Sequence, residues 1–127
     1  QPERGAGILL LAMPHVIRRG RADLEAAWRE LPRGPWRWGG VVARVEGSYL
    51  AVSGDALLVA GVVVEFGRPL HPVALVTVRE DGTAVHLWPA AAIERTEAVK
   101  RFLTQVSREL TAFGAAEILT TNLPDLV

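Results

Sequence analysis

Residues 41–88 carry the pattern of an antiparallel β-sheet. β-branched and aromatic residues come there in short runs, and turn-forming residues separate the runs. The short connections predict antiparallel neighbours, and Asp81-Gly82 is the strongest hairpin signal in the chain. The predicted strands cover residues 41–46, 49–53, 57–66, 73–79 and 83–88.

Within this sheet, residues 57–64 are apolar at every position instead of alternating with polar residues. A strand with one buried face alternates, so an uninterrupted apolar run indicates a central strand that is covered on both faces. The best candidate for a cover is a long amphipathic helix predicted at residues 93–113. Its apolar stripe consists of Val99, Phe102, Leu103, Val106, Leu110 and Phe113.

Two shorter elements precede the sheet. The apolar run of residues 7–13 ends at Pro14, which is typical of a short buried strand. Residues 21–31 place apolar side chains at helical spacing before Pro32, so they predict a short amphipathic helix. These apolar side chains are Leu24, Ala27, Trp28 and Leu31.

One more strand is predicted after the long helix. Gly114 suits the position just past a helix end, and residues 116–121 then resume a strand-like run. If this strand and the one before the helix join one sheet, they should run parallel. The whole pattern predicts a single α+β domain over residues 1–127. We expect a mostly antiparallel sheet of five to seven strands, packed against the long C-terminal helix, and one short N-terminal helix.

Composition limits the classes of function. The chain has 127 residues and a formal net charge of zero, so no overall field attracts nucleic acid or an anionic membrane. Its lack of cysteine excludes thiolate catalysis, zinc ribbons and disulfide scaffolds. The longest apolar runs fall well short of the roughly 20 residues of a membrane-spanning helix. We therefore expect a soluble, cytoplasmic protein, although the first residue, Gln1, is consistent with removal of an N-terminal segment.

The three histidines do not predict a metal site. His15, His71 and His86 are far apart in the sequence, and none has a second ligand at the spacing of a helical or hairpin site. The first two neighbour prolines and are expected in surface loops. Strand alternation directs His86 toward solvent or a polar gap.

The serines and carboxylates predict no catalytic residue. None of the serines, which are Ser48, Ser53 and Ser107, lies in a Gly-x-Ser-x-Gly elbow. Glu80 and Asp81 lie at the predicted hairpin, where acidic residues are good turn formers. Glu65, at the end of an apolar strand, is the one carboxylate whose pKa burial is expected to raise.

Trp36, Arg37 and Trp38 are the candidate interface residues. They lie near the end of a segment that is rich in proline and glycine. This segment is predicted to be a loop or, at its end, an incoming strand with both indoles on one face. Exposed tryptophans are enriched at protein interfaces, whereas the alternative is that one or both indoles pack onto the sheet as core. The surrounding N-terminal third is locally positive, so arginine and indole together also fit single-stranded nucleic acid.

The order of the predicted elements resembles the GNAT-type N-acyltransferase fold: strand, short helix, antiparallel strands, long helix, strand. The resemblance implies that residues 84–88 match the strand that holds the acyl-CoA arm. It also implies that Ala91, Ala92 and Ile93 approach the pyrophosphate at a helix N-terminus. That family's glycine-containing loop should precede the long helix, but residues 89–95 contain no glycine. The resemblance therefore implies a degenerate relative, with acetyl-CoA as the cofactor if activity persisted.

These observations favour a non-enzymatic protein-interaction or assembly domain that forms a homo-oligomer. Its contact surface is expected at the Trp36–Trp38 segment or at an exposed sheet edge. The alternatives are an acyl-CoA-dependent acyltransferase and single-stranded nucleic-acid binding through the arginine-rich N-terminal part.

Overall fold

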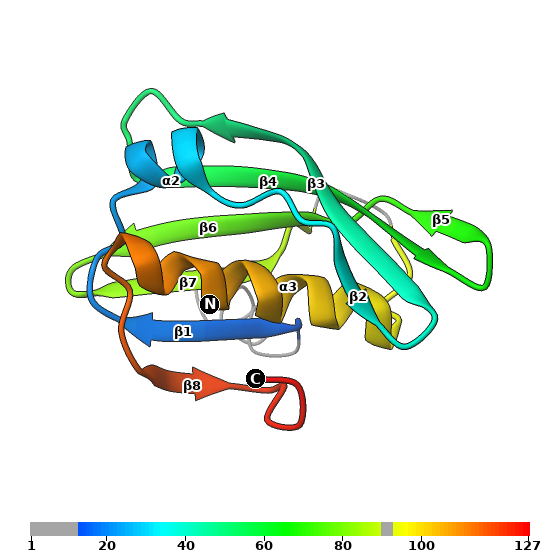
Figure 1. The fold of residues 1–127 in the computed structure, drawn as a ribbon. Coiled ribbons are helices and arrows are strands. Elements are labelled where there is room, and N and C mark those ends of the chain that lie inside the picture. Colours follow the sequence, from blue (N-terminus) through cyan, green and yellow to red (C-terminus); the bar gives the residue numbers. More distant parts are fainter. Residues whose placement is uncertain (1–12, 90–92) are drawn as a thin grey trace.

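In the described part of the chain, a curled antiparallel sheet packs with two helices (Figure 1). The computed structural model describes residues 13–89 and 93–127. Within them the sheet has eight strands in the order β2-β3-β4-β6-β7-β1-β8, with β5 paired to the end of β4. The strands are β1 (His15–Arg19), β2 (Trp36–Trp38), β3 (Val41–Leu50), β4 (Ala56–Glu65), β5 (Arg68–Leu70), β6 (Val73–Arg79), β7 (Gly82–Leu87) and β8 (Ile118–Thr121). The helices are α2 (Leu24–Glu30) and α3 (Glu97–Glu109), and η1 (Leu110–Phe113) extends α3 by a 3₁₀ turn.

The predicted apolar stripe anchors α3 to one face of the sheet. Val99, Phe102, Leu103, Val106 and Leu110 are all 0% exposed. The helix begins later than the predicted residue 93, because the hydroxyl of Thr96 caps it by accepting a hydrogen bond from the backbone N–H of Val99. The helix therefore lies across β1, β4 and β7, and the amphipathic pattern is confirmed.

A side chain of α3 packs directly onto the backbone of the sheet at Gly61, in the middle of β4. A Cβ atom at this position would stand 2.3 Å from Cζ of Phe102, far inside van der Waals contact. The Phe102 ring thus occupies the space that a side chain on residue 61 would fill, and it is fully buried. Glycine is used in this strand for close approach of a neighbouring group.

Three details of the strands differ from the prediction. The expected break at Gly47-Ser48 is wrong, because β3 continues through it with a bulge that leaves Glu46 as the extra residue. The strand β1, which follows Pro14, was not predicted. The strand that was predicted at residues 7–13 lies outside the described residues except for Met13. The short strand β5 has no counterpart in the prediction, and it brings the sheet to eight strands.

The strand after the long helix agrees with the prediction. Strands β7 and β8 each pair antiparallel with β1, which lies between them, so β7 and β8 run parallel to each other. The helix α3 provides the connection between these two parallel strands.

We predict that Gly61→Ala destabilises the fold, because the new methyl group has to displace the Phe102 ring. The expected loss is about 1–3 kcal/mol in the free energy of unfolding, measured by chemical denaturation. Adding Phe102→Leu to Gly61→Ala should relieve the collision and recover part of the loss. Gly40→Ala is the matched control, since a Cβ atom at Gly40 meets nothing within 4 Å. Equal denaturation midpoints for wild type and Gly61→Ala would contradict this account of the helix anchor.

Candidate functional site

The two faces of the sheet are covered very differently. Both helices contribute to one hydrophobic core, on the face that carries Leu57, Val59 and Val63 of β4. Because side chains alternate along a strand, the residues between them point to the opposite side, which we call the open face. No helix within residues 13–89 and 93–127 covers the open face. On it β4 presents Leu58, Ala60, Val62 and Val64, all half-buried.

Strand register aligns five large side chains of the open face in one row. Residues directly opposite in an antiparallel ladder share a face, so the pairings can be followed from strand to strand. The row, which we call the central ridge, runs through Tyr49, Leu58, Leu75, His86 and His15. Tyr49 is 63% exposed at one end of the ridge, whereas His15 is only 8% exposed at the other.

A groove lies beside the ridge because β7 carries small residues there. Gly82 and Ala84 lie between Arg79 and Thr77 of β6 on one side and Ile17 of β1 on the other. The resulting hollow, which we call the β7 groove, has a volume of about 360 Å³. It is lined by Ile17, Leu75, Thr77, Arg79 and Ala84 and is bounded by His15 and His86 of the ridge.

The pairing of two histidines was not predicted. His15 lies in β1 and is buried, so its expected place in a surface loop is wrong. Its Nδ1 atom lies 2.8 Å from the carbonyl oxygen of Met13, and its neighbour across the ladder is His86. Burial, and secondarily the proximity of His15, lower the pKa of His86 from its ordinary value. His71 is exposed between β5 and β6, as expected, with its Nδ1 atom 3.4 Å from Oε1 of Glu46.

The candidate interface residues Trp36, Arg37 and Trp38 form the edge strand β2. Both indoles are half-buried and pack against the core on the helix side, which is the second of the two arrangements considered from sequence. Arg37 pairs with Val42, points to the other face and is exposed. The Arg37 side chain and the two indoles therefore lie on opposite faces of β2. The role of this edge as an interface stays a prediction.

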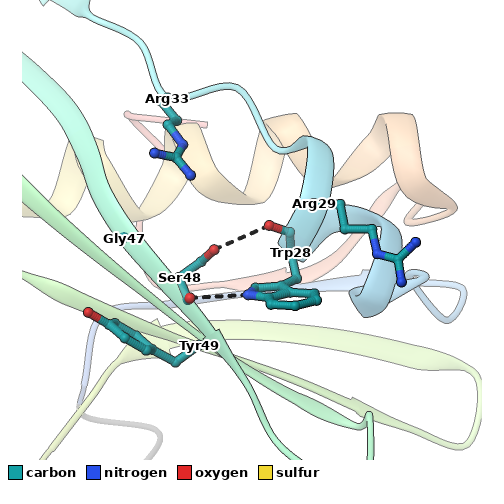
Figure 2. Close-up of a pocket in the computed structure, with 6 residues that line it drawn as sticks. All are labelled: Trp28, Arg29, Arg33, Gly47, Ser48 and Tyr49. Carbon is teal, nitrogen blue, oxygen red and sulfur yellow. Dashed lines mark hydrogen bonds between the residues drawn. The ribbon is translucent and has the colours of Figure 1, made fainter.

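A second depression lies between α2 and β3, with a volume of about 380 Å³. Its polar groups connect the helix to the strand, as Figure 2 shows. Trp28 Nε1 donates to the carbonyl oxygen of Ser48 at 3.2 Å, and the Ser48 hydroxyl donates to the carbonyl oxygen of Trp28 at 3.3 Å. Arg29 points away from this pair and forms an ion pair with Glu25, and Tyr49 projects on the far side of β3. This depression is therefore a contact that holds α2 and β3 together.

The other side chains that were considered for catalysis are not gathered in one site. The hydroxyl of Ser53 bonds Asp55, and that of Ser107 is buried and accepts a hydrogen bond from Arg18 Nε at 2.7 Å. Glu80 and Asp81 form the turn between β6 and β7, and Glu65 ends β4 half-buried. Among residues 13–89 and 93–127, no group of three histidine, aspartate or glutamate side chains is placed to hold a metal ion. No helix in that part of the chain is long and apolar enough to cross a membrane.

Of the three residues that the acyltransferase resemblance assigned to a cofactor, the structure describes only Ile93. Ala91 and Ala92 lie outside the described residues, and Ile93 is half-buried against the core. Strand β7 is paired with β6 along one edge and with β1 along the other. The resemblance stays a prediction from element order. In comparisons with known proteins, no family model matches the chain, and neither a curated protein nor a solved structure is significantly similar to it.

We predict that acid destabilises the protein through His86. A folded-state pKa below the ordinary value of 6.5 means that the unfolded chain binds the proton more readily. The contribution of neutral His86 to stability is therefore complete above pH 6.5 and is lost as the pH falls below it. In His86→Gln, the thermal midpoint should fall less between about pH 7.5 and about pH 5.5 than in wild type. His71→Gln is the control for an exposed histidine, and an equal acid response of His86→Gln and wild type would contradict the prediction.

Proposed function

We propose that this chain is a non-enzymatic interaction domain that self-associates through the open face of its sheet. One observation carries the proposal: β4 is apolar on both faces, and the described helices cover only one of them. A continuous apolar strand is typical of sheets that are buried on both sides. A second copy of the chain would cover the face that the described helices leave open.

The side chains of the open face suit such a contact. Leu58, Val62, Leu75 and Ile17 are aliphatic and half-buried, so a partner would remove their remaining accessible surface from water. Each Å² of apolar surface buried contributes about 25 cal/mol. Tyr49, exposed on the same face, is the type of residue that anchors protein interfaces.

The dimensions of the open face are compatible with a dimer. The five strands from β3 to β1 span about 19 Å, and residues 56–64 of β4 extend over about 26 Å. This gives a face of about 500 Å² per subunit, or about 1,000 Å² in a symmetric pair, which reaches the lower size of specific interfaces. Two such faces would pack with the separation of about 10 Å that is usual for stacked sheets.

Charged residues border the apolar surface. Arg37 and Arg44 project from β2 and β3, and Arg79 projects from the end of β6. All three are exposed, so they form a solvated rim of the kind that surrounds interface cores. A self-complementary contact of this type is the usual basis of homodimers with twofold symmetry.

We predict that Leu58→Lys abolishes self-association. The substitution places a charge within the central ridge, where a partner would bury it without a counter-ion, so the dimer Kd should rise at least about tenfold. Light scattering and sedimentation equilibrium over a range of concentrations measure this change. Val52→Lys is the matched control, because Val52 is fully exposed in the turn between β3 and β4.

Unchanged thermal midpoints at monomeric concentration would show that both variants are folded. A wild-type chain that stays monomeric at its highest attainable concentration would refute the proposal. If Leu58→Lys keeps the dimer and Arg37→Asp loses it, the contact lies at the β2 edge instead of the open face.

A further inference from the structure

The β7 groove has a feature that self-association leaves unused. Arg79 lies at its open end, exposed, and its guanidinium forms no ion pair or hydrogen bond within the described part of the chain. The neighbouring cations have partners: Arg19 pairs with Glu117, and Arg21 Nη1 donates to the carbonyl oxygen of Glu80 at 3.0 Å. Among residues 13–89 and 93–127, the groove therefore has one available positive charge, at its open end.

The remainder of the groove is mostly apolar. Ala84 forms the floor, and Leu75 and Ile17 provide aliphatic walls. Thr77 adds one hydroxyl, and His86 closes the far end as an imidazole that burial keeps neutral near pH 7. From Leu75 to Arg79 the groove follows β6 for about 13 Å. The groove is open toward solvent.

We propose that the β7 groove binds a linear apolar monocarboxylate, with the hydrocarbon chain over Ala84 and the carboxylate on Arg79. A guanidinium binds a carboxylate through two parallel hydrogen bonds, which matches the single charge available. The apolar walls exclude a strongly hydrated ligand such as a sugar or a nucleotide, whose polar groups would lose their water without replacement. This inference does not rest on self-association, but both use the open face, so ligand and second copy should compete.

Glu80 and Asp81 are the carboxylates closest to Arg79 in the sequence. Both are exposed at the turn after β6, and neither forms an ion pair with Arg79 among the described residues. They weaken the local positive field through solvent without blocking the guanidinium. They also favour a ligand that contacts Arg79 directly over one that is held at a distance.

The test is a titration of the full chain with decanoate, at a protein concentration where light scattering shows a monomer. Methyl NMR signals of Ala84 and Ile17 report on the groove floor and wall. We expect saturable shifts of both signals with decanoate and none with decylammonium, which has the same chain and the opposite charge. Both ligands are kept below their micellar concentrations.

Three variants test whether decanoate binds in the β7 groove. Ala84→Phe fills the floor from the solvent side and should abolish the shifts. Arg79→Gln should weaken binding about five- to tenfold, as expected for loss of a charged hydrogen-bonded pair. Arg44→Gln is the matched control, because it removes an exposed arginine of the same face outside the groove. An unchanged methyl spectrum elsewhere establishes that each variant is folded.

Three results would overturn the proposal. The first is the absence of saturable shifts, and the second is equal binding of decanoate and decylammonium. The third is contact of the Ala84 methyl with leucines of residues 9–11 in the free chain, unaffected by decanoate, which would assign the groove to the chain's own N-terminal segment. Failure of the dimer experiment changes none of these results, because they are read on the monomer.

Discussion

The contact of Phe102 with Gly61 determines which face of the sheet is core and which is open. The ring occupies the position of a missing side chain in the middle of β4, so α3 is held against the face of Leu57 and Val59. A helix of 13 residues is about 20 Å long and forms a single layer, and the chain places α2 on the same side. Strand alternation then directs the other apolar half of β4 away from the helices. This one anchor therefore explains why the described helices leave the open face uncovered.

The local elements with strong periodicity could be predicted from the sequence. The α3 stripe, the strands around β4 and β6, and the parallel relation of β7 and β8 follow from apolar spacing, turn residues and the helical connection. The bulge at Glu46 could not, since Gly47-Ser48 has the composition of a turn and only the pairing with β4 keeps β3 extended through it. Strand β1 was missed because a proline and a histidine precede its apolar residues, and its stability comes from pairing on both edges.

The candidate site depends on register, which a single sequence does not reveal. His15 and His86 are 71 positions apart in the chain, and they become neighbours because β1 inserts between β7 and β8. The groove arises in the same way, from small residues of β7 between larger ones of its neighbours. The uninterrupted apolar run of β4 predicted cover on two faces. The described helices cover one, and cover of the other face stays a prediction. Trp36 and Trp38 were expected at an interface as large side chains, yet both are half-buried and pack against the core.

The two proposals for the open face place opposite demands on the same residues. A second copy would cover the central ridge and the aliphatic side chains beside it, whereas a small ligand needs only the hollow over Ala84 and the cation at its end. Arg79 costs little at the rim of a dimer, where it stays solvated. Selection for self-association alone therefore does not explain a groove that ends in a guanidinium with no partner among the described residues. If both activities are present, they are linked: a carboxylate that binds only the free face shifts the equilibrium toward monomers in proportion to its concentration relative to its Kd. The open face would then act as the point at which ligand supply controls assembly.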